Sequence, residues 1–530
     1  MVAGSGSSHA LRHVIAHRCV SHILFLSSAC RLWLAVAHYP FDTFMRKNYL
    51  YSTLIACLLS LSLWAQPKLT VVALVDGLTT ENLAMLQPYW QQGGLRTLSE
   101  EAYKTTIAFP HLVYGGNETT ATLVTGLTPE RHGYTMDRYF DRKDRRSHPL
   151  LDDPSVHGIG TKKHVSAKAL LAQTMTDKLR LNYPTAKIYA VGIRPETTVL
   201  LAGHAANACC WLDADTKQWV ATAAYSEGLP EAAFEQNKNG RVAIYAAHQW
   251  APIMDILTYN VPTPEERKKP FSYIVGDDLY HAPEANTLVI ELALAIQKSE
   301  KMGTDAVPDL LMLHLNTLSP KAQTDRIASA EQEDMYLRLN QDLGFLMEQL
   351  DRRIGHDKYR ILVVGRPVLG TSAQTLSDIH MPVQIFNVDR AAALTATYLM
   401  ALYGHERWVD GGFGQAVFLN RSLIEQKRIS LETIRRQVAD FLMDFEGVQV
   451  AMPGHEAILY PPLASTLSKK HTGDVVFMLQ PGWKLMQDEK RTLDFVVDER
   501  PLAPLMIWSA TPAQKPQRRP DATNLYSLLF

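Results

Sequence analysis

Cysteine is scarce in this chain: its 530 residues include five cysteines, and three of these lie within the first 57 positions. The other two, Cys209 and Cys210, are adjacent, so the Cys-x-x-Cys spacing of many metal sites is absent. Neighbouring Cα atoms lie about 3.8 Å apart, which is closer than disulfide geometry prefers. We therefore expect two packed thiols, with a labile redox pair in an oxidising compartment as the alternative.

An excess of charge of one sign is also lacking. The chain has 53 lysines and arginines against 54 aspartates and glutamates, for a net charge of −1 at pH 7. A nearly neutral chain has no global electrostatic attraction to nucleic acid or to an anionic membrane, although local patches can still occur. We expect no nucleic-acid partner, and partners have to be inferred from individual sites.

The N-terminal part lacks an apolar run long enough to span a membrane. Residues 22–37 are apolar but fall short of the roughly 20 residues that a span needs, and Arg31 interrupts them. Residues 45–65 have the layout of a secretory signal peptide, with a basic start, an apolar core and a small residue before Gln66. We therefore interpret residues 1–44 as mis-assigned upstream sequence and expect the native protein to start near Gln66.

Two other interpretations of this region stay open. Residues 22–37 would be a membrane anchor in the first, and Cys57 would be the lipidated residue of a lipoprotein in the second. Most of the apolar run follows Cys57 rather than preceding it, which disfavours the lipoprotein. On the preferred interpretation the protein is exported, either periplasmic or secreted, with no membrane span in the mature chain.

Short apolar runs alternate with helical patterns along the mature chain. The runs are rich in Val, Leu and Ile without polar alternation, as in strands that are buried on both faces. They lie at 69–77, 187–193, 308–315, 359–365 and 504–510. This order predicts an α/β fold with a doubly wound, mostly parallel sheet flanked by helices.

The helical patterns lie at 166–181, 286–301 and 330–354. Segments 211–280 and 371–480 do not continue the strand–helix rhythm, and we expect them to be cap or insert segments of one domain over 66–530. Ligands of such a sheet bind outside the carboxyl ends of its strands. The polar and loop residues expected there are Asp76, the loop 111–118, Arg194, Glu196, residues 316–323 and Arg366.

Six blocks occur in order along residues 68–510: VVALVDGL, LVTGLTPERHG, LLAGHAANACCWLDADT, ANTLVIELALA, PDLLMLHL and EDMYLRLNQDL. They resemble blocks of the alkaline phosphatase superfamily, in particular the exported phosphate-irrepressible alkaline phosphatases and the type I phosphodiesterase/nucleotide pyrophosphatases. The resemblance implies an alkaline-phosphatase-like core with a two-zinc site. In that site a threonine or serine attacks phosphorus, the metals stabilise the attacking and leaving oxygens, and a phosphoenzyme is hydrolysed.

The chain departs from the family at most positions of that site. Asp76 matches the aspartate that ends the first strand and binds zinc, but the nucleophile position falls on Gly116, which has no side chain to phosphorylate. The positions of phosphate-contacting Lys and Arg residues fall on Arg194 and Glu196. The lost metal-ligand positions fall on Ser319, Gln323, Arg366, Pro367 and Leu493.

These departures bear directly on metal binding. Zinc needs about three or four N, O or S donors at roughly 2.0 to 2.3 Å. Pro367 and Leu493 have no donor side chain, and Arg366 brings a cation to the place of a dication. We expect no bound metal or other cofactor, with Asp76 as a vestigial ligand. Zinc is expected only if the family's chemistry is retained.

No other residues replace the lost groups. His132 and His204 lie in family blocks where the histidine is not a zinc ligand, and we expect structural roles for both. The other histidines near these blocks lack ligand spacing: His111, His157, His164 and His314. Thr119 or Thr120 would serve as the nucleophile only if the loop shifted, and without metals nothing activates their hydroxyls.

We therefore expect an exported, non-catalytic pseudophosphatase with a binding or assembly role. The alternative is an active metal-dependent phosphomonoesterase or a phosphodiesterase/nucleotide pyrophosphatase. The expected partner is an unidentified protein or a small anion, and the residues expected to bind the anion are Gly116, Asn117, Arg194 and Arg366. The competing expectation is a closed plug, in which Asp76, Glu118 and Glu196 neutralise both arginines.

Overall fold

The computed structural model describes residues 67–530, except 114–115, 261–268, 321, 323–325, 369–379, 381–383, 481, 488–497, 500–501, 511–519 and 526–530. The predicted upstream segment 1–44, the predicted signal peptide 45–65, Gln323 and Leu493 thus lie outside the described residues. Within the described part, no helix has the length and apolar character needed to cross a membrane.

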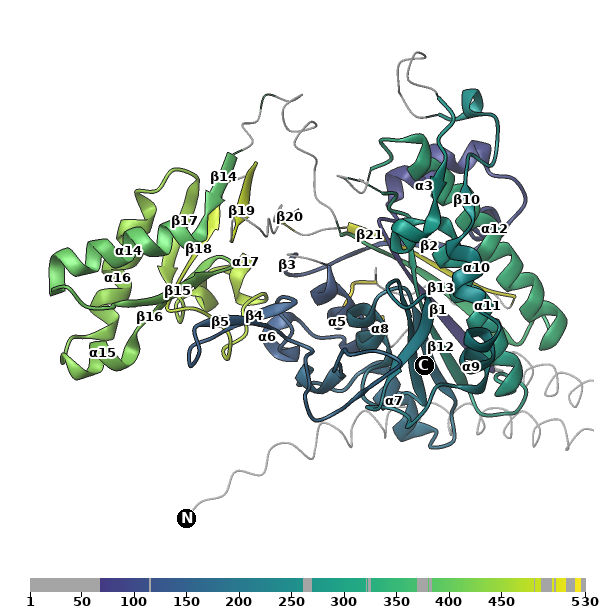
Figure 1. The fold of residues 1–530 in the computed structure, drawn as a ribbon, viewed down its shortest axis with the longest axis horizontal. Coiled ribbons are helices and arrows are strands. Elements are labelled where there is room, and N and C mark those ends of the chain that lie inside the picture. The colour runs from purple at the N-terminus through teal and green to yellow at the C-terminus, as the bar shows by residue number, and fades with distance from the viewer. Residues whose placement is uncertain are drawn as a thin grey trace, which may run out of the picture. The chain divides into compact units, whose positions relative to one another are not determined.

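A nine-stranded sheet forms the centre of the fold (Figure 1). In spatial order its strands are β2 (Tyr103–Ala108), β21 (Leu502–Ser509), β13 (Tyr359–Arg366), β1 (Leu69–Asp76), β12 (Asp309–Asn316), β7 (Ile188–Gly192), β8 (Ala208–Asp213), β9 (Gln218–Thr222) and β6 (Gly158–Ile159). The five strands from β13 to β8 pair in parallel, and the outer pairs are antiparallel. The predicted doubly wound, mostly parallel sheet is confirmed.

Strand β1 is apolar throughout because both faces of the sheet are covered. Its odd-numbered residues from Leu69 to Val75 pack into one core with α4 (Gly94–Glu101), α11 (Pro283–Ser299) and α12 (Ala330–Arg353). Val72 and Leu74 pack into a second core with the helices of the other face. Those helices are α5 (Asn117–Thr125), α7 (Met175–Asn182) and α8 (Pro195–Ala202).

The helix predicted at 166–181 starts later than expected. Residues 167–169 form one 3-10 turn, and α7 begins at Met175. The cause is a capping box: the Thr174 side chain accepts from the Asp177 backbone N–H, and the Asp177 carboxylate accepts from the Thr174 N–H. A capped start fixes the first residue of the helix more firmly than the apolar pattern does.

The segment predicted as an insert at 211–280 begins inside the central sheet. Its first part belongs to the central sheet, because β8 pairs in parallel with β7 and β9 returns antiparallel beside β8. The later part contains α9 (Glu231–Lys238) and α10 (Arg241–Ala246), and Ala233 and Val242 of these helices join the same core as α11 and α12. Here β8 still follows the strand–helix–strand rhythm of β7 and α8, whereas β9 returns antiparallel and breaks it.

The other predicted insert, 371–480, contains a hydrophobic core of its own. A four-stranded sheet of β15 (Val409–Phe413), β16 (Ala416–Leu419), β18 (Val475–Leu479) and β17 (Val448–Pro453) packs with α14 (Val388–Tyr403) and α16 (Leu431–Met443). We call residues 384–486, which hold most of this core, the small lobe; that it acts as a cap stays a prediction.

The adjacent cysteines point to opposite faces of β8, as successive residues of a strand do. Cys209 packs into one core and Cys210 into the other, and both are free, buried thiols. Burial raises the pKa of Cys210 to about 12 and also raises the pKa of Cys209. The prediction of two packed thiols is confirmed.

Candidate functional site

Three neighbouring strands bring polar residues together at one edge of the sheet. Asp76, the last residue of β1, is in register with Asn316 on β12 and with Arg366 on β13. The strands run in parallel, so their carboxyl ends meet at the same edge. Residues far apart in the sequence are thereby placed side by side where ligands of such sheets bind.

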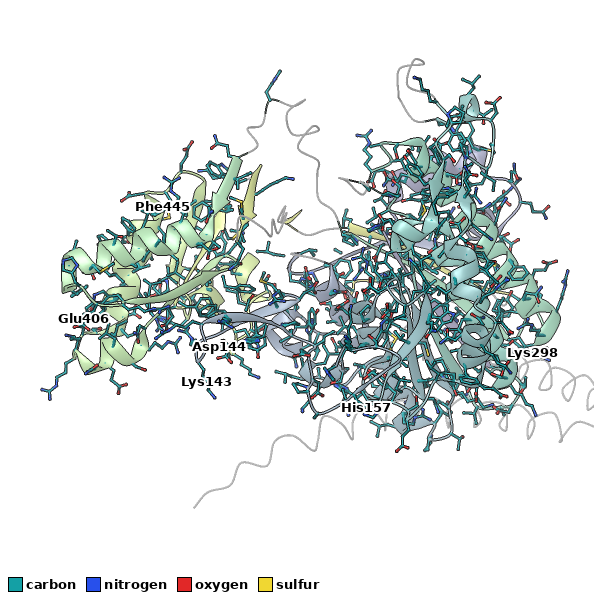
Figure 2. The ribbon with its side chains drawn as sticks, in the orientation of Figure 1. Lys143, Asp144, His157, Lys298, Glu406 and Phe445 are labelled. Carbon is teal, nitrogen blue, oxygen red and sulfur yellow. The ribbon has the colours of Figure 1, made fainter. Side chains whose placement is uncertain are left out.

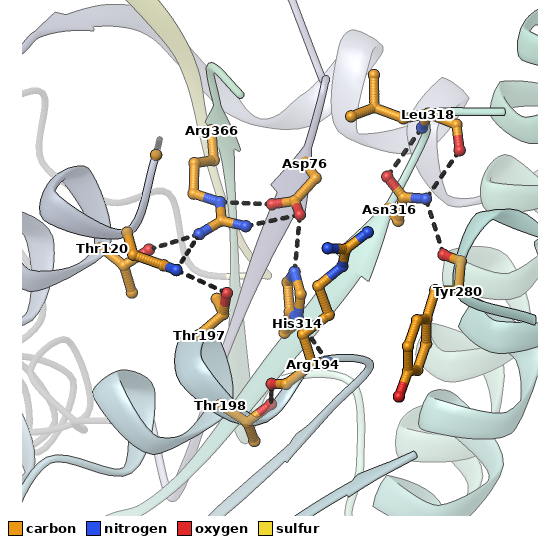
Figure 3. Close-up of polar contacts among 12 residues, drawn as sticks. Asp76, Thr120, Arg194, Thr197, Thr198, Tyr280, His314, Asn316, Leu318 and Arg366 are labelled. Atoms are coloured by element: carbon orange, nitrogen blue, oxygen red, sulfur yellow. Dashed lines mark hydrogen bonds and ion pairs between the residues drawn. The ribbon is translucent and has the colours of Figure 1, made fainter. Parts of the chain in front are cut away.

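Arg366 forms a bidentate ion pair with Asp76 (Figure 3). Its Nε lies 2.5 Å from Asp76 Oδ1, and its Nη2 lies 2.6 Å from Asp76 Oδ2. Both residues are buried, at 3% and 4% exposure. Burial alone would raise the pKa of Asp76, but Arg366 and His314 outweigh it and hold that pKa well below its ordinary value. The pair therefore stays ionised.

His314 is the second partner of Asp76, and the sequence interpretation missed it. Its Nε2 lies 3.0 Å from Asp76 Oδ2, and its Nδ1 accepts the Arg194 backbone N–H at 3.4 Å. This arrangement fixes a neutral tautomer that carries its proton on Nε2. Burial lowers the pKa of His314 despite the adjacent carboxylate. The available signal was a lone histidine inside the buried apolar strand next to the one that ends in Asp76.

The start of α5 contacts the same guanidinium. Gly116 caps the helix with a left-handed φ of 92°, and a Cβ placed there would lie 3.2 Å from the Pro367 carbonyl oxygen. The Asn117 Oδ1 accepts from Arg366 Nη1 at 2.6 Å and from the Thr197 hydroxyl at 2.8 Å. Gly116 thus stands beside Arg366 in a conformation that side chains rarely adopt.

Arg194 is at the same site but is held differently. It is exposed, and its Nη2 donates to His281 Nε2 at 2.8 Å. His281 Nδ1 in turn donates to Asp278 at 2.7 Å, so the histidine ring forms a hydrogen-bonded bridge between the Arg194 guanidinium and the Asp278 carboxylate. The Arg194 guanidinium also lies 5.6 Å from the centre of the Tyr280 ring. Among the described residues, Arg194 has no carboxylate in direct contact.

A cavity of about 300 Å³ opens between these groups. Arg194 and Arg366 both line it, as predicted, together with Asn117 and Ser319. Its acidic wall is formed by three residues, Asp76, Asp137 and Glu196. The predicted plug therefore forms only in part: Asp76 neutralises Arg366, whereas Glu196 lies 3.9 Å from Lys163 instead of pairing with Arg194, and Glu118 is fully buried outside the lining.

The two fallback threonines do not face this cavity. The Thr119 hydroxyl donates to the Gly116 carbonyl oxygen, and Thr120 Oγ1 accepts from Arg366 Nη1 at 3.3 Å. Pro367 is half-buried and reaches Gly116 only through its carbonyl oxygen. Both threonine hydroxyls are thus bonded within the protein, and neither lines the cavity.

His111 and His132 are structural, which confirms the interpretation of His132. Both bond the Thr122 hydroxyl, at 2.8 and 3.1 Å, on the buried side of α5. Tyr134 N–H donates to His132 Nδ1 at 3.1 Å, so His132 carries its proton on Nε2. Burial lowers the pKa of His111 to about 4 and that of His132 to about 3, and both are neutral.

The described residues do not fit a two-zinc centre at this cavity. Both carboxylate oxygens of Asp76 are bound by Arg366 and His314, and a dication there would lie against the guanidinium. The groups of acidic and histidine side chains that could hold a cation in the described part lie elsewhere. One is Asp141, Asp144 and His148 in the hairpin of β4 (Arg138–Asp141) and β5 (Arg146–Pro149), where Asp144 lies at the turn (Figure 2), and the other is Glu432, His455 and Glu456.

Comparison with known proteins identifies a family and similar proteins. A family model described as type I phosphodiesterase / nucleotide pyrophosphatase matches residues 70–501. Alkaline phosphatase PafA of Elizabethkingia meningoseptica is 23% identical over 461 residues, which cover 81% of this chain and 84% of that protein. Alkaline phosphatase PhoV of Synechococcus elongatus is 24% identical over 458 residues, covering 79% and 81%.

Solved structures agree on the architecture. The crystal structure of wild-type alkaline phosphatase PafA matches this chain with a TM-score of 0.76 at 21% identity, covering 88% of this chain and 96% of that one. At this level of identity the likeness shows a common fold. The predicted alkaline-phosphatase-like core is therefore confirmed.

The same relatives contradict the expectation of a non-catalytic pseudophosphatase with a binding or assembly role. PafA and PhoV are both named as alkaline phosphatases, and each matches about four-fifths of this chain. The comparison therefore favours the alternative expectation of an active phosphomonoesterase or phosphodiesterase. The prediction treated the loss of side chains for one catalytic route as the loss of all activity, which does not follow.

Proposed function

This chain belongs to the type I phosphodiesterase / nucleotide pyrophosphatase family, and from that premise we propose that it acts on phosphate esters, whose phosphoryl group binds in the 300 Å³ cavity beside Arg194. One observation carries the proposal. Arg194 lines the cavity without a directly bonded carboxylate in the described residues, whereas Arg366 is already neutralised by Asp76. A guanidinium of this kind is well suited to a phosphoryl oxygen.

The charge of the lining favours a diester over a monoester. Two guanidiniums face three carboxylates there, from Asp76, Asp137 and Glu196. A phosphodiester carries one negative charge and a monoester nearly two at neutral pH, so the monoester meets the stronger repulsion. The substrate class that we propose is therefore a phosphate diester.

Hydrolysis is the reaction that the names of the relatives support, and Asp137 is the residue that we assign to it. Its Oδ1 accepts from the Tyr134 hydroxyl at 2.7 Å and from Asn117 Nδ2 at 3.0 Å, and Oδ2 has no donor among the residues that the structure describes, so we assign it to a water molecule. That water would attack phosphorus and pass its proton to Asp137 as the P–O bond to the leaving alcohol breaks. The leaving alkoxide takes a proton from solvent.

Binding and turnover are tested separately. Calorimetric titration with a non-hydrolysable phosphonate diester should give heat with the wild-type chain and at least about tenfold weaker binding with Arg194→Ala, because one charged hydrogen bond is lost. Arg131→Ala, which changes an exposed arginine outside the cavity, is the matched control. Equal binding by all three proteins would reject the assignment of the phosphoryl site.

Turnover is measured with bis(p-nitrophenyl) phosphate on chain dialysed against a chelator. Asp137→Asn should lower kcat about a hundredfold or more with little change in binding, whereas Asp141→Asn in the hairpin should leave kcat unaltered. Absence of turnover in the wild-type chain would remove hydrolysis from the proposal but not phosphoryl binding. Turnover restored only by zinc would instead reject the metal-free role of Asp137.

Export is a further part of the proposal and depends on the sequence alone. The signal-like layout of residues 45–65 supports it. N-terminal sequencing of the protein from its native cells should give Gln66 or a neighbouring residue as the first residue. A peptide from residues 1–44 in a digest of those cells would contradict it.

A further inference from the structure

A second cavity, of about 290 Å³, lies in the small lobe and shares no lining residue with the cavity at Asp76. Helix α6 (Pro129–His132) contributes Glu130 to its wall. One side of the cavity is basic and is formed by Arg421, Arg435 and Lys469. The lining also has an apolar part, with Ile458, Leu463 and Leu467.

The basic side is built around one carboxylate. Asp474 is fully buried, and its two oxygens are shared by three guanidiniums: Arg142 at 2.7 Å, Arg421 at 2.7 Å and Arg435 at 2.9 Å. The Leu419 backbone N–H also donates to Oδ2 at 2.9 Å. Burial would raise the pKa of Asp474, but the arginines, Arg142 foremost, hold it below its ordinary value. One negative charge is therefore set against three positive charges.

The other charged groups near the cavity do not neutralise this excess of positive charge. Lys469 adds a cation to the wall and has no ion pair with a described residue. Arg142 Nη2 and Arg435 Nε are buried N–H groups without an acceptor in the described part. The nearby carboxylates of Glu432 and Glu456 are bound to Arg436 instead, which leaves Glu130 as the acidic residue of the lining.

We propose that this cavity binds a small organic phosphate or phosphonate, with its phosphoryl oxygens toward Arg421 and Lys469 and its carbon part against Ile458 and Leu463. Converging cations repel one another, and a bound dianion removes that repulsion. A phosphoryl group supplies the double charge and the oxygen spacing that guanidiniums bind in pairs. At about 290 Å³ the cavity lies just below the range for small-molecule sites, about 300 to 1,000 Å³, so the ligand has to be small. This site is independent of the proposed function.

The test is calorimetric titration of phenylphosphonate, which has no ester bond to hydrolyse, into the full chain at low salt. An Arg194→Ala background removes the contribution of the cavity at Asp76. In that background, Lys469→Glu should weaken binding at least about tenfold, whereas Lys470→Glu, on the exposed neighbour outside the lining, should change it less than about twofold. Loss of all binding on Arg194→Ala alone, or equal effects of the two lysine variants, would overturn the proposal.

A second pair of variants separates binding from folding. The Arg421 side chain is 47% exposed, so Arg421→Gln leaves Asp474 with two guanidiniums. It should weaken phenylphosphonate binding with a small change in Tm, whereas Arg428→Gln, outside the cavity on the same surface segment, should alter neither. Benzoate carries the same ring with a single charge and should bind at least about tenfold more weakly than phenylphosphonate. Equal affinities for the two ligands would reject the phosphoryl class.

Discussion

Arg366 and Asp76 show at the scale of single residues how a buried charge is tolerated. Each is buried at the wall of the cavity, and each is paired with the other, with His314 and Asn117 completing the hydrogen bonds. Removing one member of a buried pair leaves the other charge uncompensated, which is more costly than removing both. The pair is therefore a point where stability and the shape of the cavity are coupled.

Single and double substitutions test this coupling. Asp76→Asn and Arg366→Met should each lower the free energy of unfolding by about 3 to 5 kcal/mol, and the double variant should lose less than the sum of the two. Urea unfolding measures all three. Arg96→Met, which breaks an exposed pair with Glu100, should cost about 0.5 kcal/mol or less. Additive losses in the double variant would show that the two side chains do not stabilise each other.

Helix α7 carries a pH-dependent contact at the scale of one element. The Asp177 carboxylate, which caps the helix, also accepts from His204 Nδ1 at 2.8 Å. This hydrogen bond raises the pKa of His204 above its ordinary value of 6.5 and lowers that of Asp177. Because the folded state favours the charged histidine, the stabilisation is fully present below pH 6.5 and is lost as pH rises through the folded pKa.

The expected result is a difference between His204→Gln and the wild-type chain that depends on pH. The Tm of the variant should lie below that of the wild-type chain at pH 6 and approach it at pH 9. Thermal melts at the two pH values measure the gap. His164→Gln, which changes an exposed histidine bonded to a carbonyl oxygen, is the control. A gap that widens with pH would contradict the sign of the shift in the His204 pKa.

Strand β8 makes a chemical prediction at the same scale. Its two thiols lie in separate cores with raised pKa values, so they are neither exposed nor ionised in the folded protein. Iodoacetamide at pH 8 should therefore label Cys209 and Cys210 only after denaturation. Mass spectrometry of native and unfolded samples measures the labelling. Rapid labelling of the native chain, or a recovered disulfide between the two residues, would contradict the packed arrangement.

At the scale of the whole molecule, the sequence predicted the elements whose burial shows in the residues of the element itself. Unbroken apolar runs marked β1, β7, β12 and β13 because strands covered on both faces need them. The edge of the sheet that bears Asp76 and Arg366 followed from the same reasoning. The antiparallel direction of β21 and the inclusion of β8 and β9 in the central sheet did not follow, since pairing partners are set by tertiary contacts.

The sequence predicted which residues lie at the site, but not which hydrogen bonds and ion pairs they form. Arg194 and Arg366 reach one cavity as expected, yet their different states depend on which neighbour reaches each guanidinium. His314 is in register with Leu74, two pairs before the pair of Asp76 and Asn316, and this relation exists only once β1 and β12 are aligned. The non-catalytic role predicted from the missing zinc donors is contradicted by the relatives, which are named as alkaline phosphatases.

The position of β1 in the sheet also sets the order in which the chain is able to fold. Leu69 lies at the start of the described chain, but its partners on either side are Asp309 and Tyr359, and β21 closes the far side of β13 only from Leu502 onward. During synthesis β1 has no neighbour to pair with until more than half of the polypeptide has emerged. Folding that waits for such distant contacts is slow. A chain exported during that interval would cross a membrane before its central strand is enclosed, and the fold would then assemble on the far side.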